Sequence, residues 1–193
     1  MKLKTCLTTA LAVGVLLSPA AATAQMGQQG APLTIGFALG IQRGWAGIKA
    51  NLTEAAAAMP EENYLFEPNP EIRNFGELFG HVADAQFNAC AQAKGEANPK
   101  QGQPSQELAN KTKAEFVAAL KASFDFCDPV YAGLTDASAL EMVKQGNNTA
   151  ARGVILYNNI VHSNEMYGTT AVYMRLKNLV PPSTERQTRA RPD

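Results

Sequence analysis

Apolar residues recur at three- and four-residue spacing in four long stretches of this chain, and no other feature constrains the fold as strongly. The repeat is clearest in residues 34–59, where the apolar side chains fall on one face of a helix. These side chains are Phe37, Ile41, Trp45, Ile48 and Leu52. The other three stretches are residues 75–95, 106–134 and about 150–179. Long amphipathic helices without a convincing strand predict an all-α protein, a four-helix bundle.

Residues that begin or end helices bound these stretches. Asn74, followed by Glu77 three residues later, forms a capping-box pattern before the second stretch. Ser105 is placed to cap the third, and Pro60 ends the first. The less regular residues 135–149 predict a short helix or a loop.

The first residues have the pattern of a secretory signal peptide. Lys2 and Lys4 precede a twelve-residue apolar run, 6–17, and an A-x-A pattern ends at Ala24. We expect removal of residues 1–24 and export to a bacterial periplasm or beyond. The apolar run is too short for a permanent anchor. No other long apolar run follows, so we expect no stable membrane span after cleavage.

Residues 25–193 are enough for a single domain with a proper core. We expect flexible ends at about 25–33 and 183–193. Without Lys2 and Lys4, the 17 basic residues become 15, against 17 acidic ones. Because no basic stripe is present, we expect no nucleic-acid partner.

Cys90 and Cys127 remain after signal removal. In an oxidising compartment two cysteines indicate a disulfide, and two buried free thiols are the alternative. The disulfide would close a loop of 37 residues, which stabilises a fold by about 3–4 kcal/mol in the chain-entropy description.

The chain has two histidines, His81 and His162, and both fall on the apolar side of an expected helix. Ligand and metal sites in bundles are built from inward side chains on facing helices. We therefore expect a metal between the second and fourth long helices, with Met166, one turn after His162, as a doubtful third ligand. The alternative is two hydrogen-bonded core histidines.

Four more polar residues lie within reach of such a site. Asp84, one turn after His81, is placed to hold the second ring nitrogen of that histidine. Asn158 and Tyr173 are candidate outer partners. Glu165 is a weak candidate for a general base, because a glutamate on a helix is usually a solvated charge. The catalytic residues otherwise stay unknown.

Three segments resemble the DinB family, also called the DinB/YfiT-like superfamily of metal-dependent bundle proteins. They read NFGELFGHVADAQFNACA, FVAALKASFDFCDPVY and LYNNIVHSNEMYGTTAVYMRLKNLVPPST. In relatives the last segment contains the pattern H-x-N-E-H-Y-G. The resemblance implies a four-helix bundle with three histidine ligands for zinc or nickel. His81 and His162 match the first two ligand positions, and Met166 stands at the third.

The resemblance also implies a function. It implies membership of a superfamily of metal-dependent hydrolases and thiol transferases, whose known activities use a thiol for transfer or isomerisation of a small molecule and many of whose members have no known activity. Bundles of this kind often form homodimers through exposed helix faces. An exported protein meets little of the low-molecular-weight thiol of the cytosol, which weakens the transferase hypothesis.

Met166 leaves three hypotheses open. A thioether is a poor ligand for zinc or nickel and an acceptable one for Cu(I). The site therefore either keeps a divalent metal, has become a His/Met copper site, or is degenerate and binds no metal. In the last case the protein is a non-catalytic periplasmic bundle and Met166 fills the core. The absence of a C-x-x-C-H motif excludes covalent haem.

Overall fold

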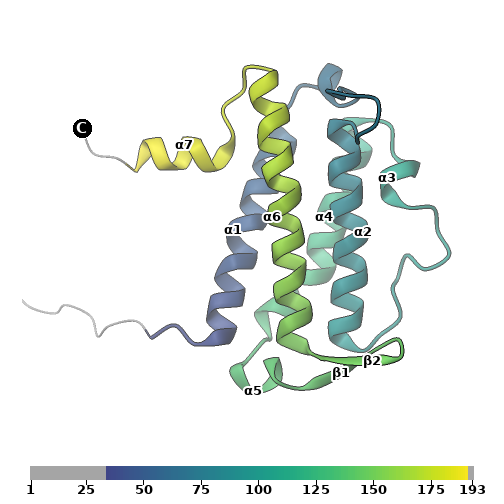
Figure 1. Ribbon diagram of the computed structural model, residues 1–193, viewed down its shortest axis with the longest axis vertical. Coiled ribbons are helices and arrows are strands. Elements are labelled where there is room, and N and C mark those ends of the chain that lie inside the picture. The colour runs from purple at the N-terminus through teal and green to yellow at the C-terminus, as the bar shows by residue number, and fades with distance from the viewer. Residues whose placement is uncertain (1–33, 191–193) are drawn as a thin grey trace, which may run out of the picture. The chain divides into compact units, whose positions relative to one another are not determined.

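The computed structural model describes residues 34–190, of which residues 35–190 belong to one compact unit. Its long helices are α1 (Phe37–Ala58), α2 (Phe75–Lys94), α4 (Lys113–Ala132) and α6 (Arg152–Leu176). α1 and α2 each pack against both α4 and α6 (Figure 1). The expected four-helix bundle is confirmed. The expected signal peptide, 1–24, and the stretch 25–33 lie outside the described residues.

The connections contain shorter elements. They are η2 (Glu61–Asn63), α3 (Gln106–Ala109), α5 (Asp136–Ala139), β1 (Met142–Gln145), β2 (Asn148–Ala151) and α7 (Pro182–Arg189). The expectation of no strand was wrong, because β1 and β2 pair as an antiparallel hairpin. Gly146 in its turn has a φ of 60°, which glycine adopts without strain. Residues 150 and 151, which were expected to begin the last long helix, belong to β2 instead.

The helix ends follow from capping residues. The capping box of Asn74 and Glu77 is present at the start of α2, as predicted. The prediction of a single helix over residues 106–134 was wrong, because this stretch forms two separate helices, α3 and α4. Thr112 and Glu115 form a second capping box there, which starts α4 afresh.

Most of the C-terminal end expected to be flexible, 183–193, forms the helix α7, and residues 191–193 lie outside the described residues. Pro182 occupies the first position of α7, where its missing N–H costs nothing and its fixed φ suits a helix. Arg186 of α7 bonds to Glu54 and Asn51 of α1. These contacts hold α7 to the bundle.

A disulfide between Cys90 and Cys127 joins α2 to α4, as the sequence predicts. The two Cα atoms lie 5.5 Å apart, and both cysteines are fully buried. The disulfide holds α2, which carries His81, against α4. None of the helices within residues 34–190 combines the length and apolar character needed to cross a membrane.

Candidate metal site

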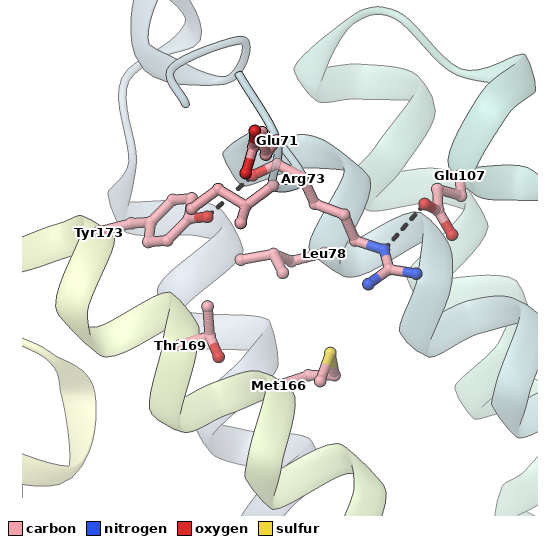
Figure 2. A pocket seen from close by; sticks show the side chains of 8 residues that line it. Glu71, Arg73, Leu78, Glu107, Met166, Thr169 and Tyr173 are labelled. Atoms are coloured by element: carbon pink, nitrogen blue, oxygen red, sulfur yellow. Dashed lines mark hydrogen bonds and ion pairs between the residues drawn. The ribbon is translucent and has the colours of Figure 1, made fainter. Parts of the chain in front are cut away.

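A pocket of about 460 Å³ lies beside α6, at the N-terminal end of α2. Its lining residues are Glu71, Ile72, Arg73, Leu78, Glu107, Met166, Thr169 and Tyr173. Figure 2 shows Met166 and Thr169 projecting from α6 on the side that faces Arg73 and Glu107. Met166 is partly buried and also packs against the hydrophobic core.

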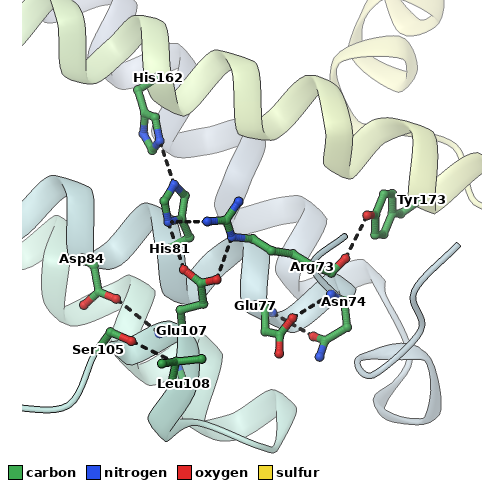
Figure 3. Close-up of polar contacts among 10 residues, drawn as sticks. All are labelled: Arg73, Asn74, Glu77, His81, Asp84, Ser105, Glu107, Leu108, His162 and Tyr173. Atoms are coloured by element: carbon green, nitrogen blue, oxygen red, sulfur yellow. Dashed lines mark hydrogen bonds and ion pairs between the residues drawn. The ribbon is translucent and has the colours of Figure 1, made fainter. Parts of the chain in front are cut away.

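His81 of α2 and His162 of α6 point at each other (Figure 3). Their Nε2 atoms lie 3.1 Å apart and their ring centroids 5.0 Å apart. The structure thus brings together the two histidines that the sequence singled out, between the two expected helices.

The second ring nitrogen of His81 contacts a residue that the sequence analysis missed. His81 Nδ1 lies 3.0 Å from Oε2 of Glu107, and the other Glu107 oxygen accepts from Arg73 Nε at 2.8 Å. Arg73 Nη2 is 3.3 Å from the same histidine nitrogen. Figure 3 shows this chain of contacts running from His162 through His81 to Glu107 and Arg73.

Asp84 has a different role from the one expected. Its carboxylate accepts from the backbone N–H groups of Gln106, at 3.0 Å, and Glu107, at 3.3 Å. Asp84 therefore holds the start of α3 instead of the His81 ring. It acts on His81 only through Glu107, because the nitrogen that Asp84 was expected to hold is already bonded to that residue.

The other expected partners are not bonded to the histidine pair. The Tyr173 hydroxyl donates to the backbone carbonyl of Arg73 at 2.9 Å. Asn158 shares a second pocket, of about 300 Å³, with His162. Glu165 is exposed on α6, and its charge raises the pKa of His162.

His162 is held mainly in its neutral form. Burial lowers the pKa of His162, the neighbouring His81 and Arg73 lower it further, and Glu165 acts in the opposite direction. The ordinary histidine pKa is about 6.5, so the ring is neutral at pH 7. A neutral imidazole is the form that binds metals. The buried Nδ1 of His162 has no hydrogen-bond partner among the described residues.

The histidine pair fits part of the metal set implied by the resemblance. Two nitrogens that share one zinc ion at about 2.0–2.1 Å lie about 3.3 Å apart in a tetrahedral arrangement. The observed separation of 3.1 Å is close to that value. Metal-binding histidines also commonly donate their other N–H to a carboxylate, as His81 can to Glu107. The donor set thus fits an ion held by two nitrogens.

The same site does not fit a three-histidine set. Within residues 34–190, no three His, Cys, Asp or Glu side chains gather into a group that could hold a metal ion. Met166 stands on the expected face of α6, but a thioether is a weak, soft donor. Any further ligand would therefore be Met166, water or a bound small molecule.

The bundle and its histidine pair define a helical protein with one candidate centre between α2 and α6. A sequence model of the DinB superfamily matches residues 47–167, which include both histidines and Met166. The chain belongs to the DinB superfamily.

Solved structures support the same fold. A DinB-like protein from Bacillus cereus is 16% identical, with a TM-score of 0.59, over 74% of this chain and 94% of that one. A DinB-like protein from Bacillus subtilis is also 16% identical, with a TM-score of 0.57, over 72% and 92% of the two chains. Among curated proteins, none matches the chain.

Proposed function

We propose that this protein is an exported DinB-superfamily bundle that binds one transition-metal ion through the Nε2 atoms of His81 and His162. The observation that carries the proposal is the 3.1 Å approach of these two atoms, with Glu107 behind His81. Two lone pairs that converge at this distance suit a common ion. The signal-peptide pattern in residues 1–24 supports export.

The donor set bears on the choice of metal. Two imidazoles suit zinc, nickel and copper alike, whereas the Met166 thioether favours Cu(I). The resemblance to DinB proteins favours zinc or nickel. With two nitrogens instead of three, the site would hold a divalent ion more weakly than a three-histidine site and would leave positions open.

Open positions matter for chemistry. A metal ion there would lower the pKa of a coordinated water or thiol and make it a nucleophile at neutral pH. The protein's own contribution is to hold His81 through Glu107 and to keep His162 neutral by burial. The pocket of about 460 Å³ beside Met166, lined by Arg73 and Tyr173, would receive a small-molecule substrate.

The test is the metal content of untagged protein exported to the periplasm of a bacterial host, measured by elemental mass spectrometry. About one zinc, nickel or copper ion per chain is expected, with loss of that ion in His162→Ala. The matched control is Asn164→Ala, which changes an exposed α6 residue that lines neither pocket beside the histidine pair. Metal bound equally by wild type and His162→Ala would disprove the proposal.

A second candidate is a non-catalytic bundle without metal. It is favoured by the packing of Met166 against the core and by the distance between the histidines, which also suits a direct hydrogen bond. In that case wild-type protein carries no metal, even after incubation with zinc, nickel or Cu(I). The same measurement therefore separates the two candidates.

A further inference from the structure

We propose that Glu107 is a positioning residue that fixes the proton of His81 on Nδ1. We also propose that the short helix α3, Gln106–Ala109, is the element that holds Glu107 beside His81. This inference rests on the proposed function for its effect on metal binding. Its effect on His81 itself does not require a metal.

The hydrogen bonds of His81 determine where its proton lies. A carboxylate can only accept hydrogen bonds and a guanidinium can only donate them. The contact with Glu107 is the shorter, at 3.0 Å against 3.3 Å for Arg73 Nη2, and it is charge-assisted. Nδ1 of His81 therefore carries the proton and donates to Glu107.

The proton on Nδ1 has a direct consequence for His162. In a neutral His81, the Nε2 atom is then a lone pair aimed at His162 Nε2, 3.1 Å away. Without a metal, His162 must donate from its own Nε2. The two histidines thus adopt opposite tautomers. With a metal, the lone pair on His81 is already presented as a ligand.

Arg73 keeps Glu107 in place. Its Nε donates to the carboxylate oxygen that His81 does not use, at 2.8 Å. The backbone carbonyl of Arg73 accepts from the Tyr173 hydroxyl of α6. The carboxylate is therefore oriented from both of its oxygens, and the arginine is itself tied to the helix that carries His162.

Glu107 reaches His81 only because α3 lies directly on α2. A Cβ atom at Gly80 would stand 2.6 Å from both the Cα and the N atom of Glu107, so no other residue fits there without moving α3. One turn later, Asp84 accepts from the first backbone N–H groups of α3. Gly80 and Asp84 of α2 thus both hold α3 in the position from which Glu107 reaches His81.

The test reads the tautomers directly in metal-free protein. Because the chain has only two histidines, ¹⁵N-histidine labelling and a long-range ¹H–¹⁵N spectrum at pH 8 yield two ring patterns. Loss of one pattern in His81→Gln assigns the spectrum. We expect His81 to be protonated on Nδ1 and His162 on Nε2. A His81 protonated on Nε2 in the wild type would overturn the proposal, whatever any variant does.

Two variants test whether α3 and Glu107 fix the proton of His81. Glu107→Ala and Gly80→Ala are both expected to remove the Nδ1-protonated pattern of His81, although the second leaves Glu107 in the chain. Glu71→Ala, which changes another carboxylate of the same pocket, is the control and should leave both patterns unchanged. An unchanged His81 pattern in folded Glu107→Ala would also overturn the proposal.

A parallel metal titration separates this inference from the proposed function. If the site binds metal, Glu107→Ala should lower the affinity about 10–100-fold, as other losses of a histidine's carboxylate partner do. If neither the wild type nor any variant binds metal, the proposed function fails. The positioning role still stands in that case if His81 is protonated on Nδ1 and His162 on Nε2. Metal binding without the opposite tautomers overturns the positioning role alone.

Discussion

Trp45 of α1 and Tyr131 of α4 stack face to face, with ring centroids 4.1 Å apart and ring planes 6° from parallel. The Tyr131 hydroxyl donates to the backbone carbonyl of Leu156 at 3.0 Å and accepts from the side-chain amide of Asn159 at 2.9 Å. Burial raises the pKa of Tyr131, so the hydroxyl stays protonated and can donate. Through this one side chain α1, α4 and α6 are joined.

Tyr131→Phe should therefore destabilise the bundle by about 1–3 kcal/mol, because it leaves the buried side-chain amide of Asn159 without its partner and removes the bond to the Leu156 carbonyl. Trp45 is the only tryptophan, and its fluorescence can follow unfolding in urea. Tyr157→Phe is the control, since Tyr157 is 53% exposed, and should change stability by less than about 0.5 kcal/mol. Equal midpoints for Tyr131→Phe and wild type would contradict this role.

In a chain without residues 1–24, whose removal is part of the proposed export, the disulfide between Cys90 and Cys127 should stabilise the fold by about 3–4 kcal/mol. Unreduced protein in denaturant should have no titratable thiol, and a reductant should lower the free energy of unfolding by this amount. The double variant Cys90→Ala, Cys127→Ala should have the free energy of unfolding of the reduced wild type, and a reductant should not change it. Two free thiols per unreduced chain would show that the pair is open in solution.

The bundle could be predicted from the sequence because its signals are local. The apolar repeat and the capping box of Asn74 and Glu77 depend on residues a few positions apart. The two histidines could be placed together because each lies on the inner face of its own helix, at positions that a family pattern marks.

Glu107 could not be found in the same way, because its contact with His81 joins residues 26 positions apart. That contact depends on how α3 docks, which no periodic pattern encodes. One signal was available: a glycine inside a helical stretch, here Gly80 beside His81, often marks the close approach of another backbone. The hairpin of β1 and β2 was missed because four-residue strands are too short for alternation to stand out.

Met166→His should raise the affinity for zinc or nickel by orders of magnitude. It replaces a weak thioether with a third imidazole at the position where the resemblance to DinB proteins implies one. Competition with a chromophoric chelator measures the change. Asn164→His is the matched control, because it adds a histidine to an exposed position of the same helix, and should leave the affinity within a few-fold of wild type. An unchanged affinity in Met166→His would mean that residue 166 does not face the ion.

Acid should destabilise the metal-free protein partly through His162. Burial, and then the charges of His81 and Arg73, lower the pKa of this group in the folded state. As the pH falls through about 6.5, the unfolded chain therefore takes up the proton first, and the free energy of unfolding decreases. The decrease ends once the pH has passed the lower pKa of the folded state.

Urea unfolding at pH 7.5 and pH 5.5 checks the sign. The loss of stability between these values should be smaller in His162→Gln, which has no proton to take up. Glu165→Gln should have the opposite effect, because it removes the charge that raises the pKa of His162. The stability of this variant should therefore go on decreasing to a lower pH than that of the wild type. If His162→Gln lost as much stability as wild type, burial of His162 would not be what makes the bundle sensitive to acid.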